Sequence, residues 1–122
     1  MQDDWRSLTD NEKRIVKKLL FGMDIPPSWE IQEYVGHEID EYGSLALLSR
    51  GDNQPANDMN PRLIASGYFD DDNQTAILGP MVEMILFEKN GVLSELQIFR
   101  SDGSPLKREI DPDKIFMIVQ RQ

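Results

Sequence analysis

A chain of 122 residues that is 39% hydrophobic and 29% charged has the length and composition of one soluble globular domain, residues 1–122. Its net charge of −9 disfavours direct contact with nucleic acid or an anionic membrane, because both attract clustered Lys and Arg. The absence of cysteine excludes disulfides and thiolate chemistry. We expect a cytoplasmic protein, since the N-terminus lacks the basic and apolar regions of a secretory signal and no apolar run could span a membrane.

The first predicted element is an amphipathic helix over residues 10–21. Thr9 and Glu12 have the spacing of a capping box, and Gly22 is typical of a residue that ends a helix. Apolar residues recur at helical spacing, namely Ile15, Val16, Leu19 and Leu20. This helix should pack one face against a sheet.

A change of period follows the first helix. Pro26 and Pro27 interrupt the chain, and residues 28–33 can form a short second helix. Alternation over residues 35–40 then predicts a strand with one acidic face, and residues 44–48 would return after a turn at Tyr42 and Gly43.

The rest of the chain reads as strands and turns. A long polar loop, residues 51–61, precedes a predicted strand at residues 62–69. Residues 76–89 contain another strand, interrupted at Gly79 and Pro80. Asn90 and Gly91 form the strongest hairpin signal in the chain and lead into a strand at residues 92–100.

The last part of the chain completes the predicted fold. Residues 106–110 form a short edge segment, and Asp111 and Pro112 begin a helical turn that includes Ile115, Phe116 and Ile118. The expected class is α+β, with the N-terminal amphipathic helix packed on a mainly antiparallel sheet of about five strands and a short C-terminal helical turn.

The acidic residues are unevenly distributed. Residues 24–58 hold eight carboxylates against the single cation Arg50, and residues 70–95 hold six against Lys89. The first helix is basic. We expect the carboxylates to gather on one flank and to steer a basic partner, because charge acts over a Debye length of roughly 8–10 Å.

The sequence contains no recognisable catalytic motif. The chain has neither a P-loop nor a dinucleotide-binding glycine pattern, and it has no nucleophile elbow. His37, the only histidine, fits a residue at the edge of the core better than a general base. Residues 70–72 lack the ligand pattern of a calcium loop. We expect no enzyme activity, no cofactor and no bound metal.

Two acidic turns are the candidate partner-binding sites. Glu38, Asp40 and Glu41 lie near Tyr42 at the predicted hairpin tip, a combination of charge and aromatic surface that is common at interfaces. A second tip consists of Asp70, Asp71 and Asp72. Tyr42, with Tyr68 or Phe69, could form the apolar centre of the contact. The alternative is that both turns are ordinary solvated loops that serve solubility.

The chain also resembles a family of small bacterial domains of unknown function. The resemblance rests on residues 8–12 with the apolar helix positions that follow, on residues 43–45, and on residues 91–98 with 102–105. Some such domains are similar in size and charge to immunity proteins of contact-dependent growth inhibition systems. That resemblance implies a toxin-neutralising protein without a catalytic motif of its own.

The expected function is therefore that of an acidic, non-catalytic inhibitor. As an immunity protein it would bind a cognate toxin domain, basic and possibly a nuclease, and block the active site of that toxin. The alternative is a small enzyme or ligand-binding domain that uses carboxylates. A monomer is expected, with pairing of two copies through edge strands as the alternative.

Overall fold

The computed structural model describes residues 5–50, 60–72 and 79–121. These residues contain one α-helix, α1 (Asp10–Leu20), and three 3-10 turns, η1 (Pro27–Trp29), η2 (Ile31–Glu33) and η3 (Pro112–Lys114). They also contain seven strands: β1 (Arg6–Ser7), β2 (Tyr34–Glu38), β3 (Leu45–Ser49), β4 (Arg62–Phe69), β5 (Val82–Lys89), β6 (Val92–Arg100) and β7 (Phe116–Gln120).

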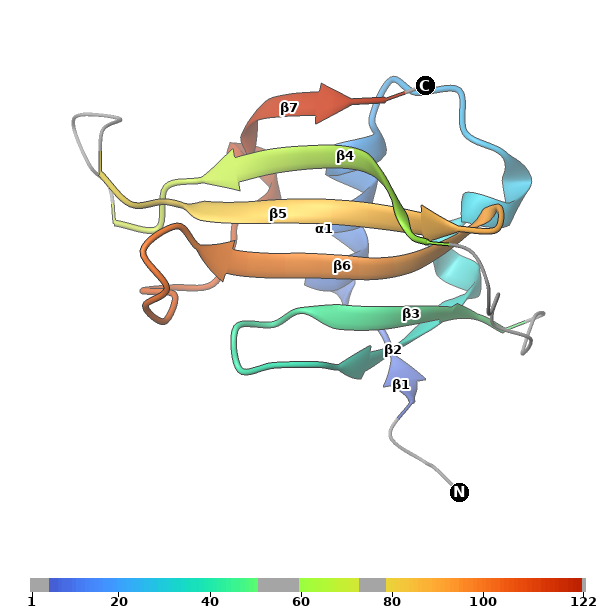
Figure 1. Cartoon of the computed structure of the whole chain (residues 1–122), viewed down its shortest axis with the longest axis horizontal. Coiled ribbons are helices and arrows are strands. Elements are labelled where there is room, and N and C mark those ends of the chain that lie inside the picture. The colour runs from blue at the N-terminus through green and yellow to red at the C-terminus, as the bar shows by residue number, and fades with distance from the viewer. Residues whose placement is uncertain (1–4, 51–59, 73–78, 122) are drawn as a thin grey trace.

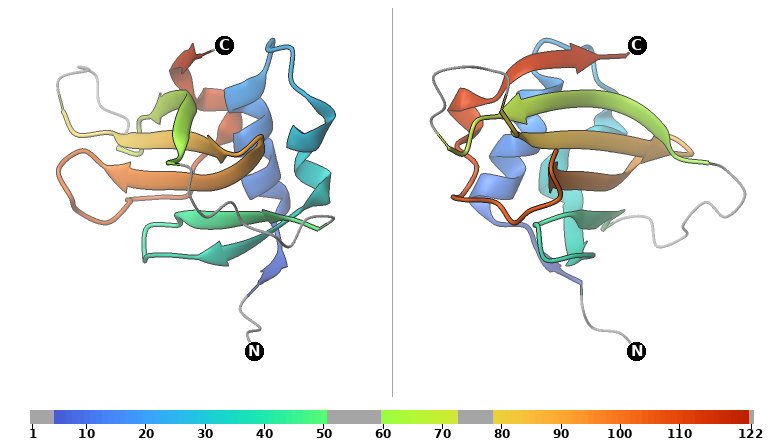
Figure 2. Two further views of the ribbon diagram at one scale, coloured as in Figure 1. Left: turned by 45° about the vertical axis from the view of Figure 1, so that its right-hand side comes forward. Right: turned by 60° about the vertical axis from the view of Figure 1, so that its left-hand side comes forward.

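The strands form a single antiparallel sheet in the order β1-β2-β3-β6-β5-β4-β7. Helix α1 crosses behind this sheet in Figure 1, and the two turned views of Figure 2 show the helical segments together on that same side. The opposite face of the sheet is covered by no helix of the described chain. The predicted α+β class and the N-terminal helix on one sheet face are confirmed.

The N-terminal end of α1 is fixed as the sequence predicts. The Thr9 hydroxyl accepts a hydrogen bond from the Glu12 amide (3.1 Å), and the Glu12 carboxylate accepts one from the Thr9 amide (2.8 Å). The helix then buries Ile15, Val16, Leu19 and Leu20. Contact with the sheet is close at Gly67, where a Cβ atom would lie 3.0 Å from Leu19 Cδ2 and 2.8 Å from Ile115 Cγ2.

The β5–β6 turn anchors one end of the molecule. Asn90 (φ 58°) and Gly91 (φ 87°) both adopt the left-handed conformation, as the hairpin signal predicts. The Gly91 carbonyl accepts hydrogen bonds from the Ser28 hydroxyl (2.9 Å) and from the Trp29 indole (3.2 Å). Turn η1 therefore lies against the β5–β6 turn.

Several predicted elements are wrong in detail. The sheet has seven strands instead of about five, because residues 6–7 and 116–120 add a strand at each edge. The helical turn after Asp111 ends at Lys114, and residues 116–120 pair with β4 because an extended chain can hydrogen-bond along that edge. Residues 106–110 form no strand, and residues 28–33 form two 3-10 turns instead of one helix.

Other predictions fall outside the described residues. Most of the polar loop (residues 51–59) and the start of the strand predicted from residue 76 lie there. No helix among the described residues has the length and apolar character needed to cross a lipid bilayer.

Candidate functional site

The two predicted acidic turns lie at the same end of the sheet, and each contacts the end of β6 or the residues after it. The Tyr42 hydroxyl, in the β2–β3 turn, donates a hydrogen bond to the Gly103 carbonyl beyond β6 (3.1 Å). Arg100, at the end of β6, pairs with Asp71 beyond the end of β4 (3.1 Å). We call residues 39–44, 70–72 and 100–108 together the acidic end; they lie at the left of Figure 1.

Asp40 shapes the β2–β3 turn. Its Oδ1 accepts hydrogen bonds from the amides of Tyr42 (2.9 Å) and Ser44 (3.2 Å), and Gly43 takes a positive φ of 102°. The Ser44 hydroxyl is buried and bonds both the amide (2.8 Å) and the carbonyl (3.0 Å) of Ile98. The turn is thus held to β6, while the side chains of Asp40 and Glu41 remain exposed.

Glu38 belongs to a separate ion cluster. Arg6 pairs with Glu38 at 3.0 Å and with Glu12 at 2.9 Å. The hydrogen bonds that Arg6 donates to the Glu12 carboxylate raise the pKa of Arg6 against the opposing effect of burial. Burial alone would raise the pKa of Glu12, but hydrogen bonds from Arg6 and Thr9 lower it below its ordinary value. Glu38 therefore ties β1 to β2 and remains largely exposed.

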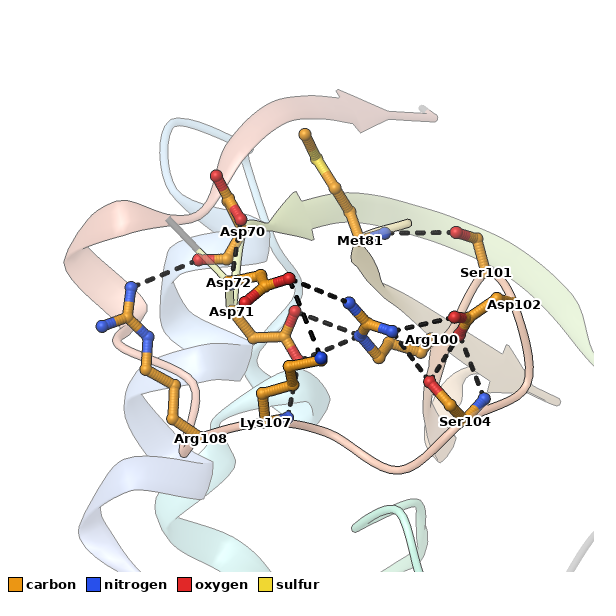
Figure 3. Close-up of polar contacts among 10 residues, drawn as sticks. All are labelled: Asp70, Asp71, Asp72, Met81, Arg100, Ser101, Asp102, Ser104, Lys107 and Arg108. Carbon is orange, nitrogen blue, oxygen red and sulfur yellow. Dashed lines mark hydrogen bonds and ion pairs between the residues drawn. The ribbon is translucent and has the colours of Figure 1, made fainter. Parts of the chain in front are cut away.

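A buried guanidinium organises the other turns (Figure 3). Arg100 Nε donates to both carboxylate oxygens of Asp71 (3.2 and 3.1 Å), and both side chains are almost completely buried. Asp71 also accepts a hydrogen bond from the Lys107 amide (2.7 Å). The prediction that all three aspartates form an exposed tip is therefore wrong for Asp71, whose charge is neutralised inside the protein.

The same guanidinium reaches a third segment. Arg100 donates to Asp102 (2.9 Å) and to the Ser104 hydroxyl (2.8 Å). Burial alone would lower the pKa of Arg100, but Asp71 and Asp102 raise it above its ordinary value. Hydrogen bonds from the side chain and backbone of Ser104, with the charge of Arg100, lower the pKa of Asp102. The Arg100 side chain thus connects the turn at Asp71 with the turn at Asp102 and Ser104.

The flanking aspartates lie nearer the surface. Asp72 is about half-exposed and lies 4.0 Å from Arg100 and 3.8 Å from Lys107. Asp70 caps the turn by accepting a hydrogen bond from the Asp72 amide (3.0 Å), and its carbonyl accepts one from Arg108 (3.4 Å). Both carboxylates therefore have defined contacts within the protein.

The remaining acids of residues 24–58 do not join them. Glu30 precedes η2 and Glu33 is its last residue, next to η1 and the β5–β6 turn at the opposite end of the sheet. Asp52 and Asp58 lie outside the described residues. The expectation of a single acidic flank is corrected accordingly: the structure divides this segment between both ends of the sheet, because β2 carries the chain from one end to the other.

The two aromatic residues proposed as anchors beside Tyr42 differ in exposure. Phe69 is buried, with Arg108 stacked over its ring at 5.7 Å, so it cannot provide a surface contact. Tyr68 points to the opposite face of β4, is half-buried and lies beside Phe116. His37, also half-buried, lies on the uncovered face beside the Trp5 ring (5.6 Å).

Sequence reasoning missed the central residue, Arg100. The signal was present in the alternation of β6, where Leu96 and Ile98 face the core and Arg100 continues their series. A cation on the buried face requires a carboxylate partner, and that requirement points to one of the neighbouring aspartates.

A groove of about 500 Å³ is lined in part by residues of the acidic end. Its floor is apolar and is formed by Ile15, Ile98, Leu106 and Ile110. Three polar side chains in its wall already bind protein groups: Glu12 binds Arg6, Tyr42 binds Gly103, and Asn11 binds the Ile110 carbonyl. Within the described ranges, no three His, Asp or Glu side chains converge as metal ligands would.

A family model described as a domain of unknown function (DUF6984) matches residues 5–110 of the chain. No curated protein and no solved structure matches it. The matched residues include α1, strands β1 to β6 and the whole acidic end, whereas β7 lies beyond them. The chain belongs to this family.

Proposed function

We propose that this DUF6984 domain is a non-catalytic binding protein that docks a basic protein on its acidic end. The observation that carries the proposal is that two acidic turns, far apart in sequence, lie at one end of the sheet and both bind the same segment, residues 100–108. A surface that is ordered before binding loses less conformational entropy on association.

The charge balance of the acidic end favours a cationic partner. Its residues carry six carboxylates and three cations, the latter being Arg100, Lys107 and Arg108. Arg100 is buried and forms ion pairs with Asp71 and Asp102. The outer surface is therefore dominated by carboxylates such as Asp40 and Glu41. Such a field raises the association rate and selects against acidic partners.

An apolar centre for the contact lies on the adjoining uncovered face of the sheet. Tyr68, Glu83 and Phe99 occupy neighbouring positions on β4, β5 and β6, and each is half-buried. Aromatic side chains at the centre of a protein interface often contribute most of the binding free energy. Tyr42 and Tyr68 remain the anchors of this proposal, and Phe69 does not.

In its specific form, the proposal is that the partner is a toxin domain and that the protein acts as an immunity protein in a bacterial cytoplasm. The support is the small size and the negative charge of the chain, which are the properties that suggested immunity proteins in the sequence interpretation. Carboxylates at the acidic end would then imitate phosphate groups and occupy a basic cleft.

The test uses the product of the open reading frame that neighbours the gene of this protein. Wild-type protein should bind that product and restore growth when the two are co-expressed. Asp40→Lys with Glu41→Lys should slow association by about tenfold and reduce its dependence on salt.

A matched control exists at the opposite end of the sheet. Glu30→Lys with Glu33→Lys makes the same change in charge, and each pair contains one carboxylate that caps a turn. The control should retain nearly wild-type kinetics. If both pairs slowed association equally, the effect would come from net charge, and the acidic end would not be the contact. Absence of both binding and growth rescue would refute the immunity function.

A further inference from the structure

The edge of the sheet formed by β7 is a second, independent surface. Strand β7 pairs with β4 on one side and with no strand of the described chain on the other (Figure 1). The Arg121 amide points to β4, where it donates to the Ile64 carbonyl (2.8 Å). Because main-chain groups alternate in an antiparallel strand, Ile118 and Gln120 direct theirs outward.

A bulge limits the length of this edge. The pairing shifts between Ser66 and Tyr68, and Met117 adopts a positive φ of 53°. The regular part of β7 is therefore only about three residues long, too short to hold two sheets together by main-chain bonds alone. A ligand at this edge needs side-chain contacts as well.

Apolar side chains surround the edge. Phe21 is 81% exposed, Met117 64% and Val119 57%, which are high values for residues of this size. Gln120 holds the end of α1 against β7 by donating to the carbonyls of Leu19 (2.9 Å) and Phe21 (2.8 Å). Two shallow grooves of about 360 and 210 Å³ meet here, and Lys18 and Phe21 line both.

The rim of these grooves is basic in a protein of net charge −9. Arg14, Lys17 and Lys18 line them, against the carboxylate of Asp113. Arg14 pairs with Asp113 (3.2 Å), whereas neither lysine forms an ion pair with any residue that the structure describes. The two lysines therefore add positive charge to this edge that is not held in an ion pair within the described residues.

We propose that the β7 edge binds an extended segment of a partner protein in which acidic and apolar side chains alternate. The segment adds to β7 as a short strand. Because successive side chains of a strand point to opposite faces, its carboxylates meet Lys17 and Lys18 on the helix side of the sheet, and its apolar side chains lie beside Val119 on the other side. A second copy of this chain fits less well, because two-fold pairing of β7 would bring two cationic rims together.

The experiment uses the full chain and a fluorescent peptide of about eight residues that alternates glutamate and valine. A peptide that alternates lysine and valine is the charge control. Fluorescence anisotropy should give at least about tenfold tighter binding of the acidic peptide, and that affinity should fall with added salt. Absence of binding, or equal affinity for both peptides, would overturn the proposal.

Two further measurements locate the contact. Lys18→Glu should weaken binding about tenfold, whereas Lys89→Glu, which makes the same change at a half-buried site near the β5–β6 turn, should not. The acidic peptide should also slow amide exchange at Ile118 and Gln120. Equal effects of the two substitutions, or protection confined to other strands, would contradict strand addition at β7.

Discussion

Two adjacent aspartates should differ sharply in their effect on stability. Asp71→Ala removes a fully buried carboxylate that accepts hydrogen bonds from Arg100 and from the Lys107 amide, and it leaves the guanidinium without its main partner. Asp72→Ala removes a half-exposed carboxylate at 4.0 Å from Arg100. The two changes delete the same atoms one residue apart.

Burial determines the expected magnitudes. Breaking a buried ion pair costs about 3–5 kcal/mol, because the remaining charge has lost the solvent and the partner that stabilised it. The exposed, long contact of Asp72 is worth ~0–1 kcal/mol. Since a domain of this size is stable by roughly 5–15 kcal/mol, Asp71→Ala removes a large part of the total and Asp72→Ala very little.

Urea unfolding followed by circular dichroism measures both values. With roughly 4 °C of melting temperature per kcal/mol, Asp71→Ala should also melt some 12–20 °C below the wild type. Asp71→Asn keeps an acceptor for the Lys107 amide but removes the charge, and it should fall between the two alanine variants. Equal destabilisation by Asp71→Ala and Asp72→Ala would refute the assignment of Arg100 as a buried hub.

Three further predictions concern the core and the helix cap. Gly67→Ala should cost about 1–3 kcal/mol in urea melts, because the new Cβ would lie 2.8 Å from Ile115 Cγ2 and 3.0 Å from Leu19 Cδ2; an unchanged midpoint would show that the contact is loose. Tyr34→Phe should cost about 1–3 kcal/mol, because the buried hydroxyl joins the Ser28 carbonyl to the Leu93 amide; a neutral effect would contradict this. The pKa of Glu12 is depressed by folding, so its stabilisation is complete above its ordinary value of 4.5 and is lost as the pH falls through the folded value. Glu12→Gln should therefore flatten the loss of stability in acid, and an unchanged pH profile would count against the Arg6 contact.

Local signals predicted much of the fold. The Thr9–Glu12 capping box and the turn at Asn90 and Gly91 act over a few residues, and the structure retains both; the strand predicted at residues 62–69 is also present. Such features can be read from sequence because neighbouring residues alone determine their geometry.

The errors arose where distant residues decide the outcome. Ile115, Phe116 and Ile118 have a spacing that suits a helical turn, yet the main-chain groups of β4 pull residues 116–120 into the sheet. Asp71 looked solvated because an aspartate triplet usually marks a surface turn, and its cation lies 29 positions away in sequence. Strand β1 has only two residues, too few to produce a periodic pattern.

The sharing of Arg100 among several segments has an evolutionary consequence. A substitution that suits the turn after β4 must remain compatible with Asp102, Ser104 and the Lys107 amide, since all of them contact the same guanidinium or its partner. Sequence changes in these segments should therefore be epistatic, and grafting one turn from a relative without the others should destabilise the recipient. New binding specificities in this family would then arise by joint replacement of the segments, or by changes confined to outward positions such as Glu41.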